Sequence, residues 1–134
     1  MKKRVAVQFV GHLRSFKKTF KTFRANIIDQ NEKCGISIDV FIHTWDELEH
    51  TDTPGHYKID KSRVGKPLTD KDLKWVQNNY KPKSIMIGKQ QALTTKETEI
   101  AAKHNIHGKV SKNMCLTFYQ SNVLREKYEQ EHCF

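Results

Sequence analysis

Short apolar runs alternate with longer amphipathic stretches along this chain. Residues 5–10 (VAVQFV) form an almost continuous apolar run, which predicts a strand buried on both faces and ended by Gly11. Residues 36–42 alternate between apolar and polar positions and predict a second strand. Residues 84–87 predict a third, shorter strand that Gly88 ends.

Helical spacing marks three further segments. Apolar side chains recur every three or four residues from Leu13 to Ile27, which predicts a helix ending near Ile28 and followed by a polar loop over 29–35. Thr69 is typical of a helix N-cap and predicts a helix over 70–79. A last helix is predicted over 111–131, with a core-facing stripe of Met114, Phe118, Ser121, Leu124 and Tyr128, widened by Cys115, Tyr119 and Val123.

The order of these elements predicts one α/β domain over residues 1–134. Strands that alternate with helices form a parallel sheet with helices on its faces, so we expect a Rossmann-like three-layer sandwich with a mostly parallel sheet. Two connections are less regular. Residues 47–67 predict a long loop, and residues 89–109 are ambiguous, with a helical turn expected over 96–103. No internal repeat or linker divides the chain.

Composition narrows the cellular compartment in which the protein is expected. No apolar run approaches the roughly 20 residues that span a bilayer, and the basic start is followed by too short an apolar stretch for an export signal. The three cysteines, Cys34, Cys115 and Cys133, are odd in number and form no disulfide-like array. These features favour reduced thiols and a cytoplasmic protein.

The net charge of +9 is concentrated at the N-terminal end, where the first 24 residues contain eight Lys or Arg and no acid. A solvated helix face is the favoured explanation. Nucleic acid binding is disfavoured because Phe16, Phe20 and Phe23 lie on the opposite, core-facing stripe, which leaves no stacking platform among the charges. Contact with the inner surface of an anionic membrane stays open.

The ends of the predicted strands carry the candidate chemistry, because ligands of open α/β sheets bind at the carboxyl ends of their strands. Gly11 would let the backbone approach a ligand, and Arg14 beside it is a bidentate donor suited to phosphate. The alternative is that Gly11 only makes a turn and Arg14 is solvated. No dinucleotide-binding or P-loop glycine pattern occurs. The third strand end is Gly88-Lys89-Gln90.

The second strand end reads His43-Thr44-Trp45-Asp46. Trp45 offers a plane on which a base can stack, and Asp46 can accept hydrogen bonds from ribose hydroxyls. Their alternative roles, equally open, are a cover over the core for Trp45 and a helix cap for Asp46. His43 is expected to be a packed, hydrogen-bonded histidine rather than a base.

Metal and nucleophile sites find little support. His104 and His107 have a possible ligand spacing, but no further ligands complete a zinc site. Asp70-Lys71-Asp72 formally reads D-x-D, yet it lies in the first turn of a predicted helix, where acids complement the helix dipole. Cys115 is interpreted as a core residue. No metal site is predicted.

Three segments of the chain resemble a family of bacterial and viral glycosyltransferase-like proteins of capsule and surface-polysaccharide synthesis. They are VAVQFVGHLRSF at 5–16, IDVFIHTWD at 38–46 and NMCLTFYQSNVLREKY at 113–128. The resemblance implies the donor-binding half of a GT-A-like fold. It also implies that a nucleotide-sugar donor lies beside Gly11, His12, Arg14, His43, Thr44, Trp45 and Asp46.

The chain departs from that family at its end. Family members continue into a strand with an R-x-R-x-D type motif, which supplies the acid for a metal ion and the diphosphate, whereas this sequence stops at Phe134. We therefore expect Mn²⁺ or Mg²⁺ to bind only if another segment supplies that motif, and the chain alone to be inactive in transfer. The alternative is a non-catalytic interaction module that self-associates or pairs with a missing C-terminal half.

Overall fold

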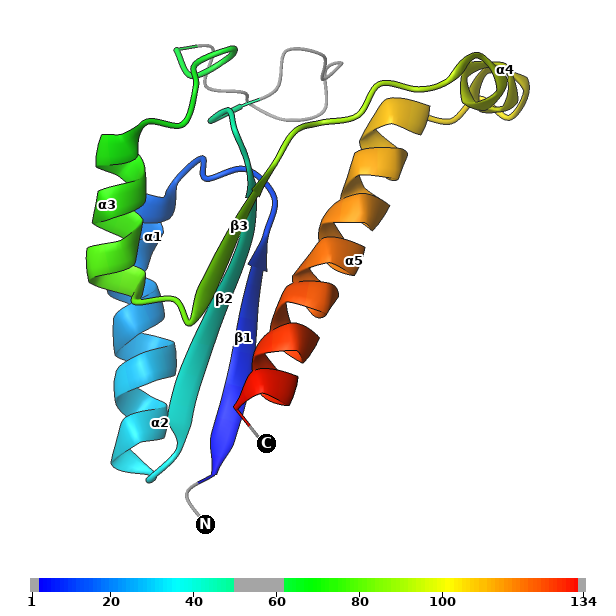
Figure 1. Cartoon of the computed structure of the whole chain (residues 1–134). Coiled ribbons are helices and arrows are strands. Elements are labelled where there is room, and N and C mark those ends of the chain that lie inside the picture. The colour runs from blue at the N-terminus through cyan, green and yellow to red at the C-terminus, as the bar shows by residue number, and fades with distance from the viewer. Residues whose placement is uncertain (1–2, 50–61, 133–134) are drawn as a thin grey trace.

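The computed structural model describes residues 3–49 and 62–132, within which three strands form one all-parallel sheet in the order β1-β2-β3 (Figure 1). The strands are β1 (Arg4–Val10), β2 (Ser37–Trp45) and β3 (Ser84–Gly88). The helical segments are α1 (Phe16–Phe23), the π-helical η1 (Arg24–Ile28), α2 (Asp29–Lys33), α3 (Asp70–Tyr80), α4 (Thr95–Lys103) and α5 (Gly108–Glu131). The predicted α/β class with a parallel sheet is confirmed.

The central strand β2 positions its neighbours. Its register with β1 runs from Arg4 opposite Ser37 to Val10 opposite His43, and its register with β3 ends at Trp45 opposite Gly88. Because every pairing is parallel, the carboxyl ends of the three strands meet at one edge of the sheet. Helices cover both faces, with α1 and α3 on one side and α5 on the other (Figure 1).

An aromatic-rich core fills the face under α1 and α3. Val40 and Ile42 of β2 pack with Phe16, Val76 and Tyr80, and all five side chains are buried. The Tyr80 hydroxyl donates to the backbone carbonyl of Phe16 over 2.7 Å, which ties α3 to the start of α1. This core fixes the position of the turn that connects β1 to α1.

The helical segment after β1 differs from the prediction at both ends. Helix α1 begins at Phe16 rather than Leu13, and helical structure runs on through η1 and α2 to Lys33. The loop predicted over 29–35 is therefore wrong for most of its length. Its polar residues reflect exposure rather than a broken helix, and the chain turns only at Gly35, whose φ is +75°.

The opposite face holds α5 through a largely polar interface. Gln8 of β1 donates to Ser121 Oγ over 3.0 Å and to Asn122 Oδ1 over 3.2 Å. Buried Leu124 and the ring contact between Phe41 and Tyr128 add the apolar part.

The stripe predicted for α5 is therefore only partly right. Ser121 and Leu124 are buried as expected, but five of the predicted members are exposed: Met114, Cys115, Phe118, Tyr119 and Val123. The inward positions are instead polar, with Asn113 and Thr117 buried. The sheet presents Gln8 and His43 on this face, and the helix turns hydrogen-bonding side chains toward them.

The remaining helices follow their local signals. Thr69 caps α3 as predicted, accepting from the Asp72 N–H over 3.2 Å. Thr94 and Glu97 form a capping box at α4, where a helical turn was expected. The long loop predicted over 47–67 is bridged at its two ends by Glu47 to Pro67 and Glu49 to Val64, and its residues 50–61 lie outside the described part. None of the described helices is long and apolar enough to cross a membrane.

Candidate functional site

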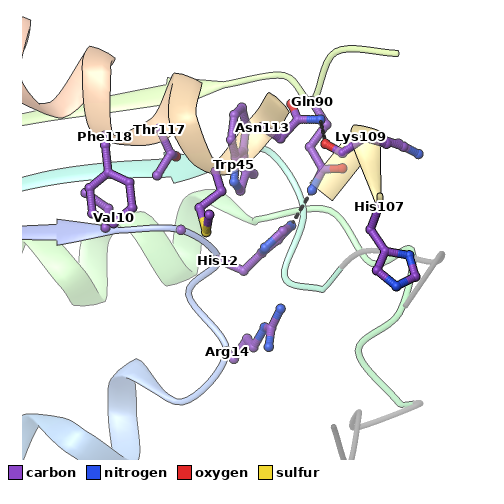
Figure 2. Close-up of a pocket in the computed structure, with 13 residues that line it drawn as sticks. Val10, His12, Arg14, Trp45, Gln90, His107, Lys109, Asn113, Thr117 and Phe118 are labelled. Atoms are coloured by element: carbon purple, nitrogen blue, oxygen red, sulfur yellow. Dashed lines mark hydrogen bonds between the residues drawn. The ribbon is translucent and has the colours of Figure 1, made fainter. Parts of the chain in front are cut away.

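A cleft of about 570 Å³ opens where β1 and β2 end, between the turn after β1 and the first half of α5. This volume lies within the range of small-molecule sites. The lining residues come from four parts of the chain: Val10, Gly11, His12 and Arg14; Trp45; Gln90; and His107, Gly108, Lys109, Asn113, Met114, Thr117 and Phe118 (Figure 2). Four of the seven predicted donor-binding residues, Gly11, His12, Arg14 and Trp45, are thus brought to one cavity.

The turn after β1 needs glycine for its backbone shape. Gly11 has a φ of +102°, a conformation that side-chain-bearing residues rarely adopt. Its N–H donates to the carbonyl of His43 over 3.1 Å, and the N–H of Arg14 donates to the carbonyl of His12 over 2.9 Å. These two backbone donors of the predicted phosphate turn are already occupied within the protein.

The Arg14 side chain is also engaged. Its Nε lies 2.9 Å from Glu49 Oε2, and the Glu49 side chain is only 3% exposed. A buried carboxylate depends on a cationic partner, so moving Arg14 onto a ligand would carry a cost in stability. Arg14 therefore lines the cleft chiefly as the partner of Glu49.

His12 lies at the base of the cleft and joins two loops. The Gln90 side-chain amide donates to His12 Nε2, with 2.9 Å between the two nitrogens (Figure 2). The same ring nitrogen lies 3.7 Å from Glu47 Oε1. Gln90 follows β3 and Glu47 follows β2, so His12 connects the ends of all three strands.

The residues at the end of β2 do not all lie in the cleft, since some of them are buried in the core. Trp45 reaches the cleft but is only 3% exposed, and its ring packs edge-on against His43 with 5.0 Å between the ring centroids. A Cβ added to Gly88 would lie 3.1 Å from both rings, so β3 leaves space for them through that glycine. His43, Thr44 and Asp46 do not line the cleft.

His43 is packed and hydrogen-bonded, as expected. It is fully buried between β2 and α5, and its Nδ1 lies 2.6 Å from Thr117 Oγ1. Burial lowers the pKa of His43 below its ordinary value of 6.5, and the nearby Gln120 side chain partly opposes that shift. Thr44 is fully buried too, whereas Asp46 is exposed and forms no helix cap, since its backbone pairs with Gly88 and Leu68.

The first half of α5 supplies the wall that the sequence did not assign to the site. Asn113 is buried and clamps the segment after β3, accepting from the Gln91 N–H over 2.8 Å and donating to the Gln91 carbonyl over 2.9 Å. Met114 and Phe118 face the cleft, and each is 53% exposed. His107 and Lys109 lie at its α5 end (Figure 2). The only sequence signal for this wall was the resemblance over 113–128.

The ionisable side chains that line the cleft are basic, although Glu49 pairs with Arg14 and Glu47 lies 3.7 Å from His12. Arg14 and Lys109 line it together with two histidines, while no acidic side chain does so among the described residues. No group of three or more His, Cys, Asp or Glu that could hold a metal ion occurs in residues 3–49 and 62–132. Asp72 of the D-x-D sequence binds Lys17 Nζ over 2.8 Å and accepts from the Thr69 hydroxyl, so it serves α3 rather than a metal.

No family model, curated protein or solved structure matches this chain. The resemblance to glycosyltransferase-like proteins therefore stays a prediction from the residues that carry it.

Replacing Arg14 tests the pairing with Glu49. We expect Arg14→Gln to lower the free energy of unfolding by about 1–3 kcal/mol, because a buried carboxylate loses its cation. In urea titrations, Glu49→Gln combined with Arg14→Gln should cost less than the sum of the two single changes. The matched control is Lys18→Gln on α1, an exposed position that should stay within about 0.5 kcal/mol of wild type. Additive single effects would contradict the pairing.

His43 should make the protein acid-sensitive. The pKa of His43 is lower in the folded protein than in the unfolded chain. As the pH falls through 6.5, the unfolded chain therefore binds a proton that the folded protein does not bind, and the free energy of unfolding decreases. We expect the free energy of unfolding, measured in urea between pH 8 and pH 5 (roughly 1.5 units either side of the ordinary His value), to fall more steeply for wild type than for His43→Gln. The control His104→Gln removes an exposed histidine and should keep the wild-type slope. Equal slopes for wild type and His43→Gln would refute the assignment.

Proposed function

We propose that this chain binds a nucleotide sugar in the cleft and is the donor-binding part of a glycosyltransferase-like protein. The observation that carries the proposal is the cleft itself, which lies at the carboxyl ends of parallel strands, as nucleotide sites of α/β sheets do. It combines basic side chains with exposed apolar ones and has no acidic lining in the described part of the chain. A nucleotide sugar, with a flat base and an anionic diphosphate, has matching chemistry.

The finer fold assignment belongs to this proposal. The parallel sheet with helices on both faces agrees with the Rossmann-like, donor-side half of a GT-A-like fold. The resemblance over 5–16, 38–46 and 113–128 adds support, because two of these segments end at the cleft and the third forms its wall. Trp45 lines the cavity while being only 3% exposed, so its two roles, a plane for the base and a cover over the core, both stay open.

A divalent ion is not assigned to this chain. Asp72 of the D-x-D sequence accepts a hydrogen bond from Thr69 at the start of α3, and the described residues contain no group of three or more His, Cys, Asp or Glu that could hold a metal ion. Within the proposal, the chain contributes donor binding, and any acid that neutralises the leaving diphosphate comes from outside the described residues. We assign no catalytic residue.

Calorimetry with UDP-sugars and GDP-sugars tests the proposal. We expect weak binding of one class, with the same affinity in Mn²⁺ and in EDTA. Met114→Glu should lower that affinity at least about tenfold, since it introduces a negative charge into the cleft that binds the anionic donor. The matched control Tyr119→Glu introduces the same charge on α5 outside the cleft and should bind normally. An absence of binding at millimolar concentrations of both classes would refute the proposal.

A second candidate function is self-association through α5. Tyr119 is 66% exposed and Val123 40% exposed, and Cys115 beside them is exposed as well. Such a row of exposed apolar side chains is typical of an interaction surface. It lies outside the cleft lining, so the two candidates do not exclude each other.

Light scattering after size exclusion tests this second candidate. We expect a concentration-dependent dimer under reducing conditions, and a monomer for the double variant Tyr119→Lys with Val123→Lys. Cys115→Ser serves as the control and should leave the dimer intact. A monomer at every concentration would remove the candidate.

A further inference from the structure

Strand β1 is an apolar strand at an open edge of the sheet. Within the part of the chain that the structure describes, it pairs with β2 on one side and with no strand on the other (Figure 1). None of its seven residues is buried, and Val5 is 44% exposed, whereas β2 is buried from Asp39 to Trp45. Apolar strands of parallel sheets are normally buried, and an uncovered edge is a template for a further strand.

The backbone groups of β1 that point away from β2 can be identified from two hydrogen bonds at its ends. The Lys3 carbonyl accepts from the Ser37 N–H over 2.9 Å, and the Gly11 N–H donates to the His43 carbonyl over 3.1 Å. Backbone groups change sides from one residue to the next along a strand, so the odd-numbered residues of β1 face β2. The residues that turn their N–H and C=O groups to the open edge include Ala6, Gln8 and Val10.

The opposite edge of the sheet is better protected. Strand β3 has only five residues, and Lys81, Lys83 and Lys89 lie just before and just after it. Short edge strands and lysines are common defences of a sheet edge against pairing with another chain. Strand β1 carries no charged residue from Val5 to Val10 and so has no such defence along that length.

We propose that two copies of this chain pair through β1, antiparallel and about a two-fold axis at Val7, and so join their sheets into one. A two-fold axis makes the interface self-complementary, because the same strand is used by both copies. With Val7 opposite itself, Ala6 of one copy faces Gln8 of the other, and these outward residues exchange backbone hydrogen bonds. The pairing goes beyond the proposed function and does not depend on it.

The side chains of β1 suit this register. Val5 lies opposite Phe9 of the second copy, and the two Val7 side chains meet at the axis. Cross-strand pairs of β-branched and aromatic side chains stabilise antiparallel strands. Arg4 lies opposite Val10, so no like charges oppose each other along the paired length. A second copy therefore offers a strand of equal length and matching side chains.

A cysteine at the axis tests the register. In a background with Cys34, Cys115 and Cys133 changed to serine, we expect Val7→Cys to form a disulfide-linked dimer under mild oxidation. The two Cα atoms at the axis would lie about 4.5 Å apart, within the range of disulfides. Val5→Cys is the matched control, because Val5 is the more exposed position. Its Cα would lie about 14 Å from its counterpart, which is too far for a disulfide.

Proline separates the open side of β1 from the side that pairs with β2. Ala6→Pro removes an N–H that points to the open edge, so each copy should keep its fold while the dimer weakens at least about tenfold. Ile87→Pro is the matched control on the edge of β3. The Gly88 carbonyl faces β2 and accepts from the Asp46 N–H, so the Ile87 N–H points outward. This control should leave the dimer intact in light scattering, and thermal melting shows whether each variant folds.

Hydrogen exchange shows whether the open side of β1 is covered in solution. A wild-type dimer in which the Ala6, Gln8 and Val10 amides become protected as concentration rises would support the pairing. A protein that stays monomeric at every concentration, with these amides exchanging fast, would overturn it and leave the edge to a strand of a different polypeptide.

The exposed row on α5 is the competing place where two copies could meet. A dimer that survives Ala6→Pro but is lost in Tyr119→Lys with Val123→Lys would place the contact on α5 and overturn the pairing of β1. A disulfide that forms at Val5→Cys and not at Val7→Cys would overturn it as well, because the strands would then meet in another register.

Discussion

The hydrogen bond between His43 and Thr117 is the constraint on which the shape of the site depends. His43 is fully buried on the central strand, so its ring requires a polar partner, and α5 supplies one at 2.6 Å. Gln8 on the neighbouring strand β1 also needs a polar partner, and it donates a hydrogen bond to Ser121 of α5. With its polar side turned to the sheet, α5 has to place Met114 and Phe118 elsewhere, and they become a wall of the cleft. A purely apolar sheet face would have drawn these two side chains into the core.

Much of the fold was readable from local patterns. The three strands, the Thr69 cap and the existence of every long helix follow from periodicity and capping chemistry, which act over a few residues. The extent of the first helical segment did not, because polar residues over 29–33 signal solvent exposure and are equally compatible with a helix or a loop. The inward face of α5 was also misjudged, since hydrophobic periodicity assumes an apolar sheet beneath and could not anticipate the side chains of Gln8 and His43.

The site shows the same division. That Gly11, His12, Arg14 and Trp45 would meet was predictable from the rule that parallel strands end at one edge. The Glu49 partner of Arg14 was not, because it lies in a segment without periodicity and pairs across 35 residues of chain. His107 and Lys109 line the cleft because of the position of the start of α5. That position depends on the connection over 89–109, whose structure the sequence left ambiguous, and on the tertiary hydrogen bonds between Asn113 and Gln91.

The path of α5 has a practical consequence for handling the protein. The helix runs back along the sheet until Tyr128 reaches the neighbourhood of Arg4, so the described chain starts and finishes at the same end of the sheet (Figure 1). The cleft lies at the other end, where β1 and β2 finish. An affinity tag or surface linker fused at either terminus is therefore attached far from the cavity. Immobilised molecules would present the open cavity to the solution whichever terminus is used.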